Sequence, residues 1–210
     1  MKNEKLNYPE IIKKFMDEGD YAKEFPLCSI LRESKSDKHS DWHNYGPVYD
    51  VLFNSLKDEK LNILEVGIMF GYSLYAWEAY FKNSNIYAGD INHEYFVNKG
   101  RIKSFYCNQE DSESIHSMLN NEDLKDIEFD IIIDDGKHEY FPNYNLLENS
   151  IHKLKKGGIY VIEDLIGYTT ERFESEKNEI KEKFNLEYVE VIRVPLPANQ
   201  IDNNLVIIIK

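Results

Sequence analysis

The sequence predicts an α/β protein with a doubly wound, mostly parallel sheet. From Asn62 onward, short apolar runs alternate with amphipathic stretches, the pattern of parallel strands with helices on both faces. The last two apolar runs, "LEYVEVIRV" and "NNLVIIIK", follow each other without a helix between them, which indicates a C-terminal antiparallel hairpin. A chain of 210 residues has the size of one ordinary domain.

Each expected element has its own sequence signal. The first 60 residues are expected to form a separate helical segment, with helices near Tyr8 to Glu18 and Pro47 to Leu56, before a sheet domain at 61–210. The five strands before the hairpin are expected at "NILEV", "NIYAGDI", "RIKSFYC", "FDIIID" and "GIYVIEDL". The helices between and after them are expected at "YSLYAWEAYF", "DSESIHSMLNN", "YNLLENSIHKLKKGG", which glycine would close, and "TTERFESEKNEIKEKF".

Composition and charge exclude several classes of protein. The formal net charge of -13 disfavours binding to nucleic acid, whose phosphates would be repelled. No apolar run approaches the ~20 residues of a membrane-spanning helix, and the first residues lack a signal-peptide core, so we expect a cytoplasmic protein. Cys28 and Cys107 have no metal-binding spacing and are expected to be packing residues.

The ends of the five expected parallel strands are polar or rich in glycine. They read "EVGIMFGYS", "GDIN", "CNQED", "DDGKH" and "EDLIG". In a doubly wound sheet, ligands bind outside the carboxyl ends of the strands, where the chain leaves each strand for a helix. Five such tips favour one shared binding site over five unrelated surface turns.

The first two strand ends suit a nucleoside ligand. Gly67 and Gly71 flank a tight turn in which glycine permits close backbone approach, and Ser73 could cap the next helix. Asp90 follows the second strand, where a carboxylate can accept hydrogen bonds from both ribose hydroxyls. Gln109 could face an adenine. The alternatives are a glycine turn needed only for packing, an Asp90 that caps a helix, and a Gln109 that merely precedes one.

The fourth and fifth strand ends combine carboxylates with a histidine. Asp135, Glu163 and Asp164 supply the hard oxygen ligands that suit Mg²⁺, Ca²⁺ or Mn²⁺, and His138 is near enough to act beside them as a base. The alternative is a set of solvated turn acids with His138 capping a helix. Two acidic pairs on tips that face one crevice favour the metal. Asp134 is expected either to contact the cofactor or to hold the turn in place.

These motifs, in this order and spacing, resemble those of class I S-adenosylmethionine-dependent methyltransferases. The resemblance is closest to the macrocin and mycinamicin type of sugar O-methyltransferase, and it covers roughly Asp37 to Asp164. The matching segments are "ILEVGIMFGYS", "YAGDI", "FDIIIDDGKH" and "KKGGIYVIEDL", with weaker likeness in "SDKHSDWHNYGPVYDVLF" and "RIKSFYCNQED". The resemblance implies a Rossmann-like fold of seven strands in which residues 1–60 act as an N-terminal lid.

The resemblance also implies roles for individual residues. His138 would be the general base. The methionine end of the cofactor would lie against Glu65, Gly67 and Gly71, its ribose against Asp90 and its adenine near Gln109. Ser73 and Asp134 complete the expected cofactor-binding residues. Mg²⁺, or another hard divalent cation, would be bound by Asp135, Glu163 and Asp164. Weaker candidates for substrate contacts are Lys137, His43, Tyr45 and Tyr49. Solvation of a loop would explain His43 equally well, and packing of a helix would explain Tyr49 equally well.

Three features depart from the family pattern. Met69 stands where many methyltransferases carry another glycine, which points to a different loop shape. Lys137 replaces the usual serine before the histidine, and it would either attract an anionic acceptor or extend into solvent. The segment "IGYTTERF" after Asp164 is unlike the family's usual continuation and leaves the acceptor open.

We therefore expect a metal-dependent transfer of a methyl group from S-adenosylmethionine to a hydroxyl of a sugar or surface-polysaccharide component. One alternative keeps the cofactor but places the methyl on a phosphoramidate or amine group of a polysaccharide precursor. Another is a non-catalytic protein that binds S-adenosylmethionine or a nucleotide. An NAD-dependent oxidoreductase would need the GxGxxG loop that this chain lacks. Aromatic residues in the first 60 positions are compatible with a lid or a homo-oligomer contact.

Overall fold

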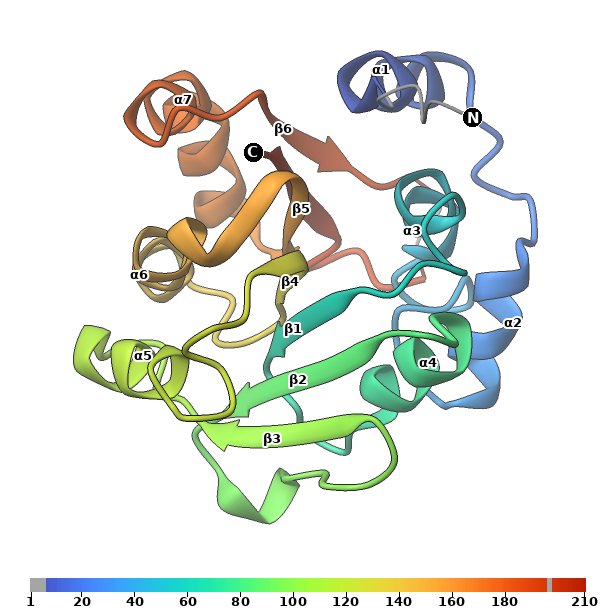
Figure 1. The fold of residues 1–210 in the computed structure, drawn as a ribbon. Helices are drawn as coiled ribbons and strands as arrows, with labels where there is room; N and C mark the ends of the chain where they lie inside the picture. Colours follow the sequence, from blue (N-terminus) through green and yellow to red (C-terminus); the bar gives the residue numbers. More distant parts are fainter. Residues whose placement is uncertain (1–6, 196–197) are drawn as a thin grey trace, which may run out of the picture.

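Seven strands form a single sheet, as expected from the sequence. The computed structural model describes residues 7–195 and 198–210. The strands are β1 (Asn62–Val66), β2 (Asn85–Asp90), β3 (Ile102–Tyr106), β4 (Phe129–Asp134), β5 (Leu154–Leu165), β6 (Tyr188–Arg193) and β7 (Asn204–Ile209). Their order in the sheet is β3-β2-β1-β4-β5-β7-β6 (Figure 1).

The first five strands are parallel, and the last two form the predicted antiparallel hairpin at the edge. The chain runs outward from β1 to β2 and β3, then returns to place β4 on the other side of β1. This reversal opens a crevice at the carboxyl ends of β1 and β4, where doubly wound folds bind their ligands. The predicted fold class is confirmed.

Helices cover both faces of the sheet, which is why the middle of β4 is a run of three isoleucines. The helices are α1 (Tyr8–Glu18), α2 (Pro26–Glu33), α3 (Gly46–Phe53), α4 (Tyr72–Tyr80), α5 (Ser112–Leu119), α6 (Tyr140–Ser150) and α7 (Gly167–Lys183), with short 3₁₀ turns η1 (His93–Tyr95) and η2 (Ile151–Lys153). The α5, α6 and α7 helices lie on one face and α1 to α4 on the other (Figure 1). Ile131 and Ile133 pack on the α4 side, while Ile132 packs toward α5 and α6.

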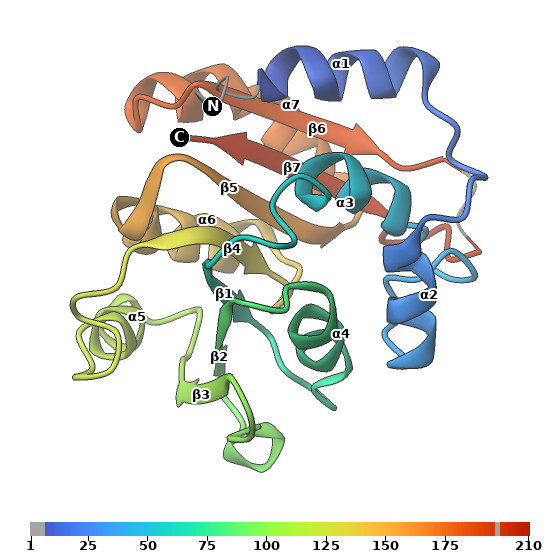
Figure 2. The same ribbon diagram turned by 45° about the vertical axis from the view of Figure 1, so that its right-hand side comes forward.

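The N-terminal helices extend the core on the α4 side of the sheet (Figure 2). Tyr49 and Phe53 of α3 stack against each other with ring centroids 5.0 Å apart, and both meet Trp77 of α4 edge to face. Such aromatic pairs add packing energy beyond the area they bury. The segment between α2 and α3 is thereby held beside the carboxyl ends of the strands.

Two helix predictions were wrong in their bounds and one helix was missed. The helix expected to end at "KLKKGG" ends at Ser150. Lys153 lies in the η2 turn, while Lys155 and Lys156 lie on β5, where Lys155 pairs with Asp130 of β4 at 2.8 Å. The helix expected over Pro47 to Leu56 is Gly46–Phe53. The α2 helix was missed because eight residues are too few to show a helical period.

The predicted packing role of the cysteines is confirmed, since both thiols are free and buried. Among the described residues, no helix is long and apolar enough to cross a membrane.

The turn after β1 depends on Gly67. Its φ of +104° is a conformation that L side chains rarely adopt, and an added Cβ would lie 1.9 Å from the backbone oxygen of Asp135. Gly157 offers a matched comparison, because its φ is +78° but an added Cβ would meet nothing within 4 Å.

We expect Gly67→Ala to lower the free energy of unfolding by at least about 3 kcal/mol, because backbone strain and a steric clash combine. Gly157→Ala should cost only about 1 kcal/mol, since it introduces the unfavourable φ alone. Urea unfolding followed by circular dichroism measures both. Equal losses in the two variants would show that the β1 turn does not need close backbone approach.

Candidate active site

Three of the predicted nucleoside residues, Gly67, Asp90 and Gln109, line one hollow at the carboxyl ends of β1 to β4. The hollow has a volume of about 340 Å³. Its lining comprises Val66, Gly67, Asp90, Ile91, Cys107, Asn108, Gln109, Glu110, Gly136 and Lys137. Asp90, Gln109 and Gly67, which lie far apart in the sequence, are thus brought together as the strand-end pattern predicted.

Asp90 holds the glycine turn of β1 from the neighbouring strand. Its Oδ2 accepts hydrogen bonds from the backbone N–H of Ile68 at 2.7 Å and of Met69 at 3.4 Å. Its Oδ1 accepts one from the N–H of Asn92 at 2.7 Å. Asn92, and not Asp90, caps the η1 turn, so the helix-capping alternative for Asp90 is wrong. Met69 has a φ of +47°, so the loop adopts the backbone shape that favours glycine although methionine stands there.

Asp134 and Gln109 organise the turn after β4. Asp134 is fully buried, and its carboxylate accepts hydrogen bonds from Gln109 Nε2 at 2.6 Å, Asn143 Nδ2 at 2.9 Å and the N–H of Gly136 at 3.3 Å. Gln109 Oε1 accepts a further bond from the N–H of Lys137 at 2.9 Å. Burial raises the pKa of Asp134 to about 7 despite these donors. The structure therefore places Asp134 in the turn and Gln109 both in the turn and on the wall of the hollow.

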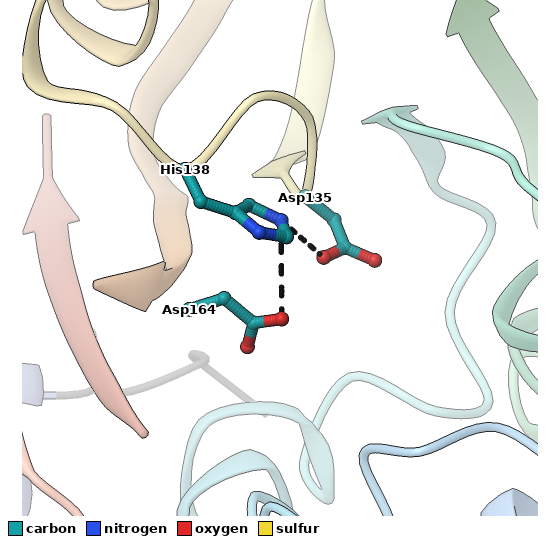
Figure 3. A group of neighbouring side chains, drawn as sticks. All are labelled: Asp135, His138 and Asp164. Carbon is teal, nitrogen blue, oxygen red and sulfur yellow. Dashed lines mark ion pairs between the residues drawn. The ribbon is translucent and has the colours of Figure 1, made fainter. Parts of the chain in front are cut away.

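Asp135, His138 and Asp164 converge beside this hollow (Figure 3). Each offers one ligand atom, and these atoms all lie within 4.8 Å of one another. His138 Nε2 lies 3.4 Å from Asp135 Oδ1 and 3.8 Å from Asp164 Oδ2. His138 and Asp164 both have left-handed backbone conformations, with φ of +58° and +56°. Non-glycine residues in this conformation are often found at functional sites.

The alternative of solvated turn acids does not fit this cluster. Asp164 is 6% exposed, Glu163 is fully buried, and α6 is preceded by Glu139 at its cap position and not by His138. Burial, followed by the charge of Asp135, raises the pKa of Asp164 to about 6. Burial lowers the pKa of His138, but the carboxylates of Asp135 and Asp164 outweigh it and raise the value to about 9. The imidazole is therefore protonated at neutral pH when only the protein surrounds it.

Glu163 contacts two residues of the N-terminal segment. Its Oε1 accepts a short hydrogen bond from Tyr49 Oη, and its Oε2 lies 2.6 Å from Lys38 Nζ. Burial raises the pKa of Glu163, and the nearby carboxylates of Asp135 and Asp164 add to this while Lys38 opposes it. Glu163 is thus not among the three residues that form the geometric cluster.

Glu65 is also fully buried. Its Oε2 accepts a hydrogen bond from Trp77 Nε1 at 2.7 Å. Ser73 forms a further hydrogen bond with this carboxylate and lies within α4, so the prediction that it caps the helix was wrong; Gly71 precedes the first helical residue.

Lys38 lies at the site, although sequence analysis placed it only within the lid and gave it no role of its own. Its side chain is 2% exposed, and its ammonium lies 2.5 Å from Asp135 Oδ2, 2.6 Å from Glu163 Oε2 and 3.8 Å from Glu65 Oε1. Burial would lower its pKa, but these carboxylates raise it well above the ordinary value. In the polar segment "SKSDKHSDWH", nothing in the local pattern separates Lys38 from Lys35. Only the fold brings it to the strand ends.

The other candidates from the same segment lie at the carboxylates too. Tyr45 Oη donates to Asp164 Oδ1 at 2.6 Å, and His43 Nδ1 lies 3.6 Å from the same oxygen. His43 is 3% exposed, so loop solvation does not account for it. Tyr49 combines the expected helix packing with its bond to Glu163. Lys137 is half-exposed, and its ammonium pairs with Glu110 at 2.5 Å.

Comparison with known proteins identifies relatives that share this fold. The sequence matches no protein-family model. It is 31% identical over 141 residues to demethylmacrocin O-methyltransferase of Streptomyces fradiae, which covers 61% of this chain and 33% of the relative. It is 30% identical over 146 residues to the 8-demethyl-8-(2-methoxy-alpha-L-rhamnosyl)-tetracenomycin-C 3'-O-methyltransferase of Streptomyces olivaceus, covering 66% of this chain and 36% of the relative. The chain is related to the macrocin and mycinamicin type of sugar O-methyltransferase.

A solved structure agrees with this relationship. The MycE methyltransferase of the mycinamycin biosynthetic pathway, in complex with Mg, SAH and mycinamycin VI, superposes with a TM-score of 0.73 at 20% identity. The match covers 90% of this chain and 54% of that chain. At this identity the likeness shows the fold, which is the predicted Rossmann-like methyltransferase fold. The chain spans about a third of the length of the curated relatives it matches.

The convergent cluster fits a hard divalent cation. The carboxylate oxygens of Asp135 and Asp164 are hard donors that Mg²⁺ or Mn²⁺ accepts in proteins. Among the described residues, His138 Nε2 and Glu163 Oε2 are buried without a hydrogen-bond partner of good geometry. The carboxylate donors favour a bound ion, with His138 beside it.

Asp134→Asn tests whether the β4 turn depends on a carboxylate. We expect a loss of about 2 kcal/mol in the free energy of unfolding, because the new amide N–H₂ would face a donor from Gln109 or Asn143. Asp123→Asn is the control, since its exposed pair with Lys103 should be worth less than about 1 kcal/mol. Chemical denaturation measures both. If Asp134→Asn lowers the free energy of unfolding by no more than the control does, Asp134 does not organise the turn.

Proposed function

We propose that this chain is a metal-dependent methyltransferase that moves a methyl group from S-adenosylmethionine to a hydroxyl of a sugar or surface-polysaccharide component. The observation that carries the proposal is the position of the nucleoside hollow directly beside the cluster. Gly136 lines the hollow, and its neighbour Asp135 belongs to the cluster. A cofactor bound in the hollow would therefore present its methyl group toward His138. The sugar O-methyltransferases to which the chain is related support the reaction class.

The proposed cofactor site has two adjoining parts. Asp90 accepts the ribose hydroxyls, and Gln109 lies against the adenine, in the hollow that both residues line. A second hollow of about 220 Å³, lined by Ser73, Lys38, Asp135 and the Met69 loop among others, takes the methionine end. Gly67 and Gly71 shape the loop between the two parts. Glu65, which is fully buried, supports the methionine end through Ser73 and Lys38.

Asp135 and Asp164 would hold the divalent cation beside His138. When bound, the cation would supply positive charge that fixes the acceptor and lowers the pKa of its hydroxyl. Positive charge at these two carboxylates also offsets their effect on His138, whose pKa they raise to about 9. The imidazole could then lose its proton near neutral pH, as a base must.

The protein's own groups have two tasks in this reaction. The sulfonium already activates the methyl group, so the walls of the site mainly align the acceptor oxygen, the methyl carbon and the sulfur. His138 accepts the hydroxyl proton as the new carbon–oxygen bond forms and the carbon–sulfur bond breaks, and S-adenosylhomocysteine leaves with the electron pair on sulfur. Asp164 is buried and Asp135 is only partly exposed, so solvent screens their electrostatic contacts less than it would at the surface.

We propose that the acceptor reaches the site on the side covered by the N-terminal segment, which we interpret as the lid. Tyr45 and Tyr49 hold Asp164 and Glu163, so we assign them to positioning and not to direct acceptor binding. The partner of Lys137 is Glu110, which weakens the alternative that Lys137 binds an anionic phosphoramidate. A non-catalytic binding protein would have no use for the carboxylate and histidine cluster on the acceptor side.

Asp90→Ala should weaken S-adenosylmethionine binding at least about ten-fold, because the two ribose hydrogen bonds are lost. Glu94→Ala, an exposed acid on the adjacent η1 turn, should leave binding unchanged. Isothermal titration calorimetry gives both affinities, and a thermal melt checks that Asp90→Ala remains folded. Wild-type affinity in a folded Asp90→Ala variant would exclude Asp90 from the cofactor site.

His138→Ala should reduce methyl transfer to a sugar acceptor by about 10²- to 10⁴-fold, the usual contribution of a general base. Cofactor affinity should stay within about three-fold, because the hollow does not include the imidazole. The readouts are transfer of a labelled methyl group and calorimetric titration with S-adenosylmethionine. Turnover at the wild-type rate would disprove the role of His138 as base.

A further inference from the structure

Two strongly exposed aromatic residues follow the strand ends that form the cluster. Phe141 is the second residue of α6, shortly after His138, and Tyr168 is the second residue of α7, shortly after Asp164. Each of the two aromatic residues is 69% exposed. Large aromatic side chains are buried for the most part in folded proteins, so an exposed pair beside a reaction site indicates a surface for a ligand.

The first turns of α6 and α7 hold these two rings on a common support. Tyr140, which precedes Phe141, packs on Phe173 of α7 with ring centroids 4.9 Å apart. The Arg172 guanidinium lies over the rings of Tyr140 and Phe141, at 3.9 and 4.8 Å from their centroids. Its Nη1 also donates a hydrogen bond to Tyr168 Oη at 3.2 Å. Arg172 thus joins Phe141 and Tyr168 into one surface, which we call the aromatic platform.

The guanidinium that joins the platform is itself fixed in place. Arg172 Nε donates a hydrogen bond to Glu176 Oε1 at 2.9 Å, and Tyr140 Oη donates a short one to Glu176 Oε2. An arginine that stacks on an aromatic ring also favours one orientation of that ring. A surface whose side chains are ordered before binding loses less conformational entropy when a ligand arrives. The exposed rings are therefore held as a binding surface requires.

A hollow beside Phe141 indicates the charge of the ligand. Phe141, Glu110 and Glu148 line this hollow, whose volume of about 390 Å³ suits a small molecule. Glu110 also lines the nucleoside hollow, so the two hollows adjoin. Both carboxylates are paired: Glu110 lies 2.5 Å from the ammonium of Lys137, and Glu148 lies 2.6 Å from that of Lys183. An anionic ligand would have to compete with these carboxylates for the lysines, whereas a sugar hydroxyl can donate a hydrogen bond to a carboxylate oxygen.

We propose that Phe141 and Tyr168 bind the methyl acceptor, and that the C–H face of a neutral sugar ring packs on the aromatic platform while one hydroxyl of the sugar faces His138. The inference rests on the proposed function and adds to it the residues that bind the acceptor and the acceptor's lack of charge. Aromatic rings suit this task, because a sugar presents C–H groups on its faces and hydroxyls at its edge. Tyr168 and Arg172 lie in "IGYTTERF", the segment that departs from the family pattern.

Saturation-transfer NMR on the full chain, with S-adenosylhomocysteine and Mg²⁺ present, tests the platform directly. The probes are the methyl glycosides of glucose, galactose, mannose and rhamnose. We expect transfer to the ring C–H protons of at least one glycoside, with an affinity that falls at least about five-fold in Phe141→Ala and in Tyr168→Ala. Met16→Ala, which removes an exposed apolar side chain of α1, should leave the affinity unchanged. Wild-type affinity in both platform variants, or no transfer to any of these glycosides, would overturn the inference.

Two conservative variants separate ring stacking from general apolar contact. Tyr168→Phe keeps the ring and loses only the Oη contact with Arg172, so glycoside affinity should stay within about two-fold of the wild type. Phe141→Leu keeps an apolar side chain but loses the ring, and should bind glycosides as weakly as Phe141→Ala. Wild-type affinity in Phe141→Leu would show that the ring itself is not needed and would contradict stacking.

The charge of the acceptor and self-association of the chain are tested separately. Phosphates of the same sugars should bind more weakly than the methyl glycosides, and tighter binding of the phosphates would overturn the neutral acceptor. Sedimentation velocity should give the same oligomeric state for the wild type and Phe141→Ala. A dimer that dissociates in Phe141→Ala would make the platform a contact between two copies of the chain, and would overturn the inference.

Calorimetric titration with S-adenosylmethionine distinguishes failure of this inference from failure of the proposed function. Phe141→Ala should bind S-adenosylmethionine with wild-type affinity, because Phe141 does not line the nucleoside hollow. A wild-type chain that binds S-adenosylmethionine but none of the glycosides would contradict the platform alone. A wild-type chain that binds no S-adenosylmethionine would contradict the proposed function, whether or not glycosides bind.

Discussion

The ion pairs between Lys38 and the buried carboxylates at the strand ends are the constraint on which the site depends. Three acidic side chains surround one ammonium that is almost inaccessible to water. Removing one partner of a buried ion pair typically costs about 3–5 kcal/mol, because the remaining charge stays buried without compensation. The buried carboxylates at the strand ends therefore have a compensating positive charge only while residues 34–45, which include Lys38, are docked on them. Docking of the N-terminal segment and assembly of the site are consequently one event.

The sheet supplies the other half of this arrangement. Parallel pairing places Val66 of β1 beside Asp134 of β4, and Asp134 beside Ile162 of β5, so the residues that follow each strand emerge at one edge. The apolar strands are fixed by helices on both faces, which leaves the carboxyl ends as the place where polar side chains meet. The buried carboxylate of Asp134 stabilises this edge by accepting hydrogen bonds from the side-chain amides of Gln109 and Asn143. Asp135, His138 and Asp164 converge at this edge of the sheet.

Much of this could be predicted from the chain, for identifiable reasons. The strand ends carry their acids directly after apolar runs, so Asp90, Asp135, Glu163 and Asp164 could be placed at one edge from the parallel topology alone. Lys38 could not be placed there, because its contact with Asp135 spans 97 residues and depends on how α2 and α3 pack against α4. Met69 was expected to alter the cofactor loop, but the backbone keeps the left-handed conformation that glycine would favour.

The most direct measurement is a diffraction experiment on crystals of the full chain grown with S-adenosylhomocysteine and Mn²⁺, using the anomalous signal of manganese. We predict a manganese peak beside the carboxylates of Asp135 and Asp164, with the ribose of the nucleoside at Asp90. A nucleoside bound away from Asp90, or no manganese among Asp135, His138 and Asp164, would contradict the assignment of this edge of the sheet as a methyl-transfer site.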